Sequence, residues 1–380
     1  MIFADHAATT PVRREALEAM WPYLTGAFGN PSSRHGVGEE AARALAWARE
    51  TVAAVVGARP GDVVFTSGGT EADNLAVKGL GLATPRGRHV VVSPVEHEAV
   101  LEAADALRRL HGFEVAHVEV DATGAVTPEA LARVIRPDTT LVSVQLANNE
   151  VGTVNPIADL ARVAHGVGAL MHTDAVQAAG WLPLAVDDLG VDALSLAGHK
   201  VGAPKGTGAL VVRGRLPLEP VLHGGGQERG RRSGTENVAG AVAFATALRL
   251  AEDDRADAAA RVADVTAAFR ARVAVGVPDA VPTGHPDRRL PGTVSYVFPG
   301  TGGEAVLLEL ERRDVVVSSG SACAAGSDEP SHVLTAMGLA PEVAQTAVRF
   351  SFGADVTEAD AAAAADALAE AVSAVRDIVA

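Results

Sequence analysis

The chain has 380 residues, of which 48% are hydrophobic, so it can bury a sizeable core. A chain of this length is typical of two or three domains. With 47 acidic and 32 basic residues its formal net charge is −15, which argues against non-specific binding to nucleic acid, since that binding depends on neutralising phosphates. The single cysteine cannot form an internal disulfide, and this fits a reducing compartment. The N-terminus lacks a signal-peptide pattern and no apolar stretch reaches the roughly 18 residues of a membrane span, so a cytoplasmic location is expected.

Predicted strands and helices alternate along much of the chain. A strand-like segment at residues 2–5 precedes the first helix. Five short apolar runs that end in polar residues are predicted strands: 88–97, 140–150, 169–177, 192–200 and 208–214. Helices are predicted between them at 127–135, where Thr127 is the N-cap, and at 158–166, which ends on a glycine. Near-continuous apolar strands with helical crossovers indicate an α/β fold around a mostly parallel sheet.

The pattern changes in the last third of the chain. A long Ala-rich helix at roughly 253–275 is followed by a strand at 291–298, a helix in GGEAVLLELERR, a strand in DVVVSS and a last long helix. We therefore expect a large α/β domain at residues 15–255 and a smaller α+β domain formed by residues 1–14 and 256–380.

Polar residues gather at the predicted strand ends. Ligands of parallel α/β sheets bind outside the carboxyl ends of the strands, so we expect a site there. The residues concerned are His97, Asn148, Asn149, Glu150, Asp174, Gln177, His199 and Lys200.

Lys200 and Asp174 carry the main chemical signal. Lys200 follows a predicted strand in SLAGHKVGAPKG, where glycines and a proline indicate a turn that exposes the amine. In a desolvated pocket such a lysine becomes a nucleophile able to form a Schiff base. Asp174 ends another strand, and a carboxylate there can pair with the ring nitrogen of pyridoxal phosphate, which makes the ring an electron sink. Alone, each has an ordinary explanation, a solvated lysine or a helix N-cap, but the combination is much rarer and indicates this cofactor.

Other segments fit a cofactor with a phosphate group. SGGTEADNLAVKG (67–79) places Gly69 and Thr70 at a helix start, where N–H groups and the dipole favour an anion, although an ordinary Gly turn looks the same. It matches neither a Walker loop nor GxGxxG, which argues against a dinucleotide. His97 can stack on a cofactor ring or move protons, or it is structural. Arg349 lies in an apolar stretch and needs a partner, either a substrate carboxylate or a structural ion pair.

Together these motifs resemble the cysteine desulfurases of the NifS/IscS type, a branch of the class-V aminotransferase group. The resemblance runs nearly end to end, through DHAATTP (5–11), FGNPSSRH (28–35), FTSGGTEADNLA (65–76), VEHEAV (95–100), NNEVGTVNPI (148–157), HTDAVQ (172–177), AGHK (197–200), PKGTGAL (204–210), HGGGQERGRRSGTEN (223–237) and SSGSACAAGSDEPSHVL (318–334). It implies the PLP-dependent transferase fold of type I, with a mostly parallel, seven-stranded central sheet in the large domain, and a homodimer.

The resemblance also implies roles for matching residues. Lys200 would bind the cofactor as a Schiff base and then move the Cα proton, Asp174 would hold the ring nitrogen, and His97 would stack on the ring. The other cofactor contacts would be made by Gly69, Thr70, Asn149, Gln177, Gly198 and His199, with the two amides at the phenolic oxygen and Thr70 and His199 at the phosphate. Thr235 would reach the phosphate in the neighbouring subunit. Arg349, together with Asn149, would hold the substrate carboxylate.

Cys323, the single cysteine, lies among small residues in SSGSACAAGSDEPS (318–331). In the family a loop cysteine attacks the sulfur of cofactor-bound L-cysteine as a thiolate and leaves with a persulfide. Small, flexible residues allow the thiol to travel to the surface. The resemblance therefore implies conversion of L-cysteine to L-alanine, with His97 as acid–base for a thiol, no metal, and delivery of sulfur to an iron–sulfur scaffold, a tRNA-thiolation enzyme or another acceptor.

Alternatives stay open at this point. A selenocysteine lyase or a class-V aminotransferase would use the same scaffold, although the placement of Cys323 argues against a transaminase. A sulfur carrier without catalysis would have no need of Lys200, Asp174 and His97. One departure from the family concerns the phosphate: many relatives have serine where this chain has Ala197, so backbone N–H groups or His199 would have to compensate.

Overall fold

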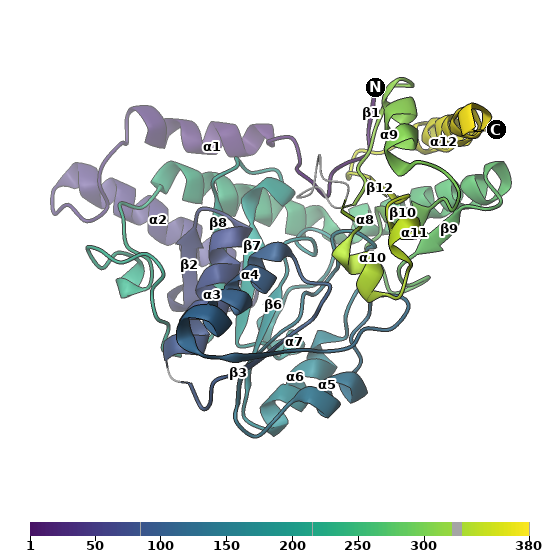
Figure 1. The fold of residues 1–380 in the computed structure, drawn as a ribbon. Helices are drawn as coiled ribbons and strands as arrows, with labels where there is room; N and C mark the ends of the chain where they lie inside the picture. Colours follow the sequence, from purple (N-terminus) through teal and green to yellow (C-terminus); the bar gives the residue numbers. More distant parts are fainter. Residues whose placement is uncertain (84, 215, 321–328, 380) are drawn as a thin grey trace.

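The computed structural model describes residues 1–83, 85–214, 216–320 and 329–379 (Figure 1). Its centre is a seven-stranded sheet with the strand order β2-β8-β7-β6-β5-β3-β4. The strands are β2 (Val63–Thr66), β3 (His89–Val92), β4 (Glu114–His117), β5 (Thr139–Ser143), β6 (Leu170–Asp174), β7 (Ala193–Ala197) and β8 (Gly208–Val212). Neighbours pair in parallel except for β8, which is antiparallel to both β7 and β2. The expected α/β fold with a mostly parallel, seven-stranded sheet is confirmed.

Helices cover both faces of this sheet, because successive strand residues face opposite sides. Val63 packs in one core with residues of α2 and α8, whereas Val64 packs in another core with residues of α3 and α4. The helices that precede or flank the strands are α1 (Arg14–Thr25), α2 (Gly36–Val55), α3 (Gly69–Ala83), α4 (Glu98–His111), α5 (Pro128–Val134), α6 (Ile157–Gly166), α7 (Val186–Leu189) and α8 (Val238–Gly276). Strands buried on two faces explain why the sequence shows continuous apolar runs there instead of alternation.

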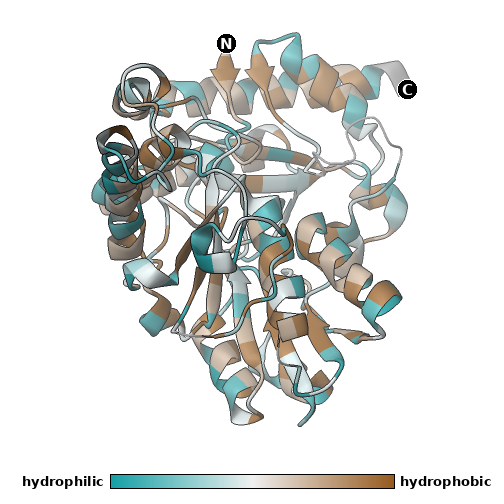
Figure 2. Ribbon diagram, turned by 90° about the vertical axis from the view of Figure 1, so that its left-hand side faces the viewer, coloured by the Kyte–Doolittle hydropathy of each residue, from teal (hydrophilic) through white to brown (hydrophobic). Residues whose placement is uncertain are grey.

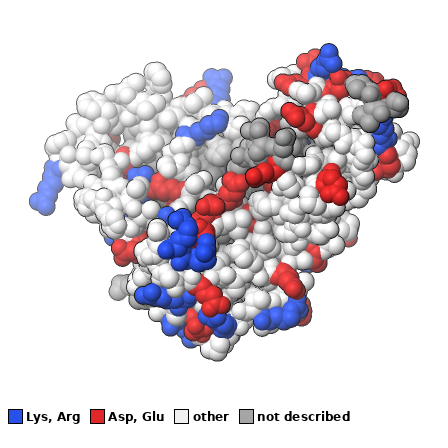
Figure 3. Space-filling view, viewed as in Figure 1, with Lys and Arg blue, Asp and Glu red and all other residues white. Residues whose placement is uncertain are grey.

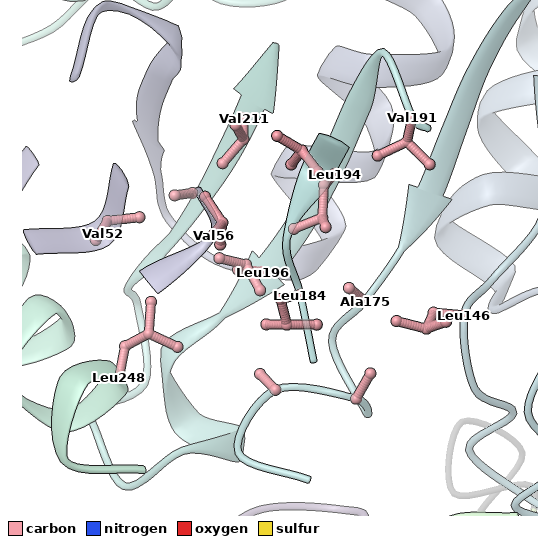
Figure 4. Close-up of a cluster of buried hydrophobic side chains, with 14 of the residues drawn as sticks. Val52, Val56, Leu146, Ala175, Leu184, Val191, Leu194, Leu196, Val211 and Leu248 are labelled. Atoms are coloured by element: carbon pink, nitrogen blue, oxygen red, sulfur yellow. The ribbon is translucent and has the colours of Figure 1, made fainter. Parts of the chain in front are cut away.

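The hydropathy colours agree with this arrangement: the strands of the sheet are largely brown in Figure 2. Figure 4 shows part of the larger core, where Leu196 and Val211 from the sheet lie with Val56 and Leu184. All four side chains are almost completely shielded from solvent. The sheet therefore has a rigid interior from which residues at the strand ends project.

A separate hydrophobic core lies in the upper right part of Figure 1. Two small sheets contribute to it, one with parallel strands β1 (Ile2–Phe3) and β11 (Val315–Val316) and one with antiparallel strands in the order β12-β10-β9. Its other elements are β9 (Val281–Thr283), β10 (Thr293–Val297), β12 (Val348–Ser351), α9 (Gly303–Glu311) and α12 (Glu358–Val379). The short helices α10 (His332–Ala336) and α11 (Pro341–Ala344) pack in a further small core together with Val95 and Val151. The N-terminal strand thus joins the C-terminal part of the chain.

Helix α8 differs from its expected bounds. The sequence predicts a helix at roughly 253–275, but α8 starts at Val238, where the side chain of Asn237 accepts a hydrogen bond of 2.9 Å from Gly240 N–H. The first part of α8 is buried all round, so it has no polar face to produce a helical period. Because α8 passes from the large core into the separate one, the expected domain boundary at residue 255 falls inside a helix. The division into domains stays a prediction.

The basic segment ERGRRSG (228–234) has a local structural role. Glu228 is buried and accepts hydrogen bonds of 2.6 and 2.7 Å from the guanidinium of Arg49, and a third of 3.2 Å from Phe65 N–H. The Arg49 guanidinium also lies over the Phe65 ring, 4.9 Å from its centroid. This ion pair joins α2, β2 and the loop before α8.

We expect Glu228→Gln to lower the free energy of unfolding by about 3 kcal/mol, because it leaves a buried guanidinium without its counter-charge. The measurement is the thermal unfolding midpoint of the full chain. The control is Glu119→Gln, whose carboxylate pairs with Arg133 at 2.9 Å but is 79% exposed, and which should change stability by less than about 1 kcal/mol. Equal midpoints for the two variants would contradict the structural role of Glu228.

Candidate active site

A cavity of about 270 Å³ lies at the carboxyl edge of the central sheet. Residues that follow four of the strands line it: His97 after β3, Asn149 after β5, Asp174 and Gln177 from β6, and Lys200 after β7. The parallel pairing of β3, β5, β6 and β7 brings these strand ends to one side, as the sequence predicts. A second cavity, of about 320 Å³, reaches Lys200 from the side of α8, β12 and the segment before α1, but it contains neither Asp174 nor His97. We therefore take the smaller cavity as the candidate site.

Asp174 is the acid at the end of β6. Its Oδ1 accepts a hydrogen bond of 2.8 Å from Val176 N–H, and the residue is 7% exposed. Burial raises the pKa of Asp174, while the Val176 N–H, His97 and the charge of Lys200 act in the opposite direction. A carboxylate with a backbone donor and a nearby lysine is suited to bind a protonated ring nitrogen.

Lys200 ends a short 3₁₀ turn (Gly198–Lys200) after β7. Its Nζ donates to the carbonyl oxygen of Ala7 and, at 2.9 Å, to that of Ala8. The side chain of Gln177 also donates to Ala7 O, at 2.9 Å. The N-terminal residues therefore set the position of the amine. A sequence pattern cannot assign this role, because backbone carbonyls carry no residue-specific signal.

His97 is the N-cap of α4, and its Nδ1 accepts a hydrogen bond of 3.1 Å from Ala99 N–H. An imidazole nitrogen that accepts a hydrogen bond carries no proton, so the neutral ring has its N–H at Nε2. The backbone thus fixes which nitrogen of His97 can donate a proton.

Gly69 and Thr70 begin α3, a 15-residue helix, at the same cavity. A Cβ on Gly69 would lie 2.9 Å from Val176 Cγ2, so a larger residue does not fit this turn without movement. The helix dipole and its first N–H groups favour an anion at this end. The one acidic side chain in the first turn, Glu71, is paired with Arg232 at 2.8 Å, and hydrogen bonds from Arg232 and Ser67 outweigh burial and lower its pKa.

His199 also lines the cavity. Its Nδ1 lies 3.2 Å from Thr9 Oγ1, and its carbonyl accepts a bond of 2.8 Å from Thr10 Oγ1. Burial, followed by the charges of Lys200 and Lys205, lowers the pKa of His199 to about 4. The imidazole is therefore neutral at pH 7 and can serve a phosphate as a hydrogen-bond donor, without adding positive charge.

The sequence leaves two partners open for Arg349, a structural ion pair or a substrate carboxylate, and the structure has features of both. It is 1% exposed, and its Nη2 donates to Asp5 Oδ1 at 2.6 Å, which is a structural ion pair. Its Nη1 donates to Asn149 O at 2.8 Å and Gly320 O at 3.2 Å. It also lines the cavity, and its buried Nε has no hydrogen-bond partner among the described residues. That free donor is available to a ligand carboxylate.

Three sequence-predicted residues do not line the cavity, and a fourth cannot be placed relative to it. Gly198 is buried beside Thr207, where a Cβ would lie 2.1 Å from the hydroxyl oxygen, so it serves close packing. Asn148 is used by a turn, where its Oδ1 accepts the N–H groups of Glu150 and Val151, each at 2.8 Å. Thr235 is exposed and lies away from the cavity of its own chain. Cys323 lies outside the described residues, although Gly320, shortly before it, borders the cavity.

Several residues at the site were not singled out from the sequence. They are Asp5, Ala7, Ala8, Asp73, Glu96, Gln145 and His332. Asp73 and Glu96 stand inside motifs that carry the family resemblance, but nothing in a sequence distinguishes a buried acid of a helix or loop from an exposed one. On the face shown in Figure 3, acidic side chains cross the middle of the molecule. Glu98, which is exposed, lines the cavity. Among the described residues no cluster of three or more potential metal ligands occurs.

The chain matches the model of the aminotransferase class-V family over residues 2–363. It is 42% identical to the cysteine desulfurase IscS of Dictyoglomus turgidum, over 99% of this chain and 96% of that protein. Among solved structures, a NifS-like protein superposes with a TM-score of 0.91 at 36% identity, covering 98% of this chain and 99% of that one. SspA, solved in complex with cysteine, superposes with a TM-score of 0.80 at 37% identity, covering 92% and 98%. Within the described ranges no helix combines the length and hydropathy of a membrane span.

We expect Asp5→Asn to destabilise the cofactor-free protein by about 2 kcal/mol, because it removes the charge that compensates the buried Arg349. The measurement is again the thermal unfolding midpoint. Asp355→Asn is the matched control, since the Asp355 side chain is 88% exposed and lies 3.9 Å from His6; it should stay within about 0.5 kcal/mol of the wild type. An unchanged midpoint for Asp5→Asn would show that Arg349 needs no anionic partner.

Proposed function

This chain belongs to the class-V aminotransferase family, in the branch of the NifS/IscS-type cysteine desulfurases, and we propose that it converts L-cysteine to L-alanine and leaves the sulfur on Cys323 as a persulfide. The observation that carries the proposal is the meeting of Asp174, Lys200 and the start of α3 at one cavity. This set provides a partner for a ring nitrogen, a nucleophilic amine and an anion site, which are the contacts that pyridoxal phosphate requires.

The residues at the cavity fit pyridoxal phosphate. Asp174 would hold the ring nitrogen, and Lys200 would bind the cofactor covalently. Gly69, Thr70 and His199 would take the phosphate, where Ala197 offers no hydroxyl, and Asn149 with Gln177 would contact the phenolic oxygen. The cofactor, when bound, supplies an electron sink for the bonds at the substrate Cα.

Lys200 is the proposed base for the Cα proton of the substrate. Its Nζ is oriented by the carbonyls of Ala7 and Ala8, so the amine stays in a narrow range of positions next to Asp174. Arg349 would bind the substrate carboxylate through its free Nε, while Asp5 and Asn149 keep the guanidinium in place. His97 would give or take a thiol proton at Nε2, since its Nδ1 is occupied by Ala99 N–H.

The sulfur transfer balances without an external oxidant. The Cys323 thiolate attacks Sγ of the substrate, an S–S bond forms, and the C–S bond breaks with its electron pair left on the carbon side. Protonation of that carbon gives L-alanine, and the enzyme keeps the sulfur as a persulfide. Comparisons that name cysteine desulfurases favour this reaction over a selenocysteine lyase or an aminotransferase.

We further propose a homodimer in which Thr235 reaches the phosphate of the partner subunit. Thr235 is exposed and does not line the cavity of its own chain, which fits a contact across subunits.

The acceptor of the sulfur is proposed to be a protein, either an iron–sulfur scaffold or a tRNA-thiolation enzyme. The cytoplasmic location stays a prediction.

Cys323→Ala should bind pyridoxal phosphate as the wild type does and yet release neither alanine nor sulfide from L-cysteine. The assay incubates purified protein with L-cysteine and a thiol reductant and quantifies both products. Wild type should give them in equal amounts. Alanine or sulfide from the variant above a protein-free control would remove the thiol from the mechanism and favour a lyase or a transaminase.

A further inference from the structure

Three buried carboxyl groups interact with one another at the cavity or directly behind its wall. Asp73 comes from α3, Glu96 follows β3, and Asp174 ends β6; the three residues are 1%, 0% and 7% exposed. Asp73 lines the same cavity as Asp174. The negative charges of Asp174 and Glu96 both act on Asp73. The proposed mechanism uses Asp174 alone, so the two other acids need an explanation.

The three groups differ in what stabilises a negative charge on them. Asp174 has a backbone N–H donor at 2.8 Å, and Lys200 lies nearby as a cation. Asp73 receives a hydrogen bond from the Ser195 hydroxyl, but its buried Oδ1 has no hydrogen-bond partner within the described part of the chain. The only basic group that forms a salt-bridge contact with it there is His172, whose Nε2 is 3.8 Å from that Oδ1.

His172 does not supply the missing charge. It is fully buried on β6, with Nδ1 2.8 Å from Ser143 Oγ and Nε2 3.0 Å from Ser195 Oγ. Burial lowers its pKa to about 3, so the imidazole is neutral at pH 7. A carboxylate buried without a cation is costly, and such a group takes up a proton instead.

Glu96 is in a similar position. Its Oε1 accepts Gln145 N–H at 2.7 Å, whereas Oε2 is buried without a partner among the described residues. Burial raises its pKa well above the usual range, with a further contribution from Asp174. Asp174 is therefore the member of the cluster whose surroundings best support an anion.

We propose that Asp73 is a positioning residue held as a neutral carboxylic acid, so that Asp174 carries the single negative charge of the three-acid cluster that meets the ring nitrogen of the cofactor. The proposal rests on the proposed function, since it assumes that pyridoxal phosphate binds at Asp174. Ser195 and the packing of α3 hold the neutral Asp73 beside the cavity. Burial, with repulsion from Asp174, raises the pKa of Asp73 well above its usual range.

The sign of the effect on stability follows from this assignment. A carboxyl whose pKa is higher in the folded state keeps a proton that the unfolded chain releases above about pH 4, so its contribution to stability falls as the pH rises from there. His172 acts in the opposite direction, because its lowered pKa makes the folded state less stable as the pH falls below about 6.5. A comparison of wild type with an Asp73 variant cancels the contribution of His172.

The first test compares Asp73→Asn with Glu228→Gln, the same change from carboxyl to amide in two buried acids. In the cofactor-free full chain, Asp73→Asn should raise the thermal midpoint by several degrees at about pH 8 and by much less at about pH 5. Glu228→Gln should lower it, because that carboxylate pairs with Arg49. A lower midpoint for Asp73→Asn at about pH 8 would mean that Asp73 is ionised and would overturn the proposal.

The second test measures binding of pyridoxal phosphate and the pH titration of the visible absorbance of the bound cofactor. Asp73→Asn should keep the affinity within about twofold and the titration midpoint unchanged, whereas Asp174→Asn should lose at least about tenfold in affinity. Asp73→Leu, which has a similar size but no polar atom for Ser195, should weaken binding and shift the titration. If Asp73→Asn weakens binding as much as Asp174→Asn, or if Asp73→Leu equals wild type, the proposal is wrong.

Failure of the Asp73 proposal can be distinguished from failure of the proposed desulfurase function. Alanine formation by the wild type is measured on the same preparations. Cofactor binding without alanine would refute the desulfurase activity while the Asp73 tests remain decisive. Absence of cofactor binding by the wild type would refute both.

Discussion

Hydrogen bonds from residues 5–10 hold the edge of the central sheet and strand β12 together, and the shape of the cavity depends on them. The carbonyl oxygens of Ala7 and Ala8 accept hydrogen bonds from the Lys200 amine. Asp5 forms an ion pair with Arg349 on β12. The backbone N–H of Ala7 is bound by Ser351 Oγ at 2.9 Å. A group proposed to contact the substrate Cα and a group proposed to contact its carboxylate are thus fixed by one short segment. Lys200 follows a strand of the central sheet and Arg349 lies on β12, which packs in the separate core. Residues 5–10 are therefore what connects these two side chains.

Burial of charge is the second constraint on the site. Each buried cation in the argument has an anion or carbonyl partner, as Arg49 has Glu228 and Arg349 has Asp5. The buried acids at the cavity are not matched in this way, and they outnumber the cations available to them. A bound cofactor with a protonated ring would restore the balance at Asp174. Buried carboxyl groups without a cation lower the stability of the fold, so their presence here is better explained by the chemistry of the site than by folding.

The sequence predicts the central sheet and most of the cavity because both depend on local patterns. Apolar runs mark the strands, and the residues that follow them, such as Asp174 and Lys200, meet because parallel strands share one edge. The start of α8 was missed because a helix buried on all sides has no polar face. The contacts of Ala7 and Ala8, the pairing of Arg349 with Asp5, and the burial of Asp73 depend on segments far apart in the chain, which no local pattern reports. The placement of Thr235 across subunits and the persulfide on Cys323 stay predictions.

The most direct test of the account identifies the lysine that binds the cofactor. The chain has three lysines, Lys78, Lys200 and Lys205, so reduction of the loaded protein with borohydride followed by peptide mass spectrometry distinguishes them. The account predicts that the reduced cofactor is attached to Lys200 alone. Attachment to Lys78 or Lys205, or a loaded protein with no attached cofactor, would contradict the assignment of the cavity at Asp174 as the active site.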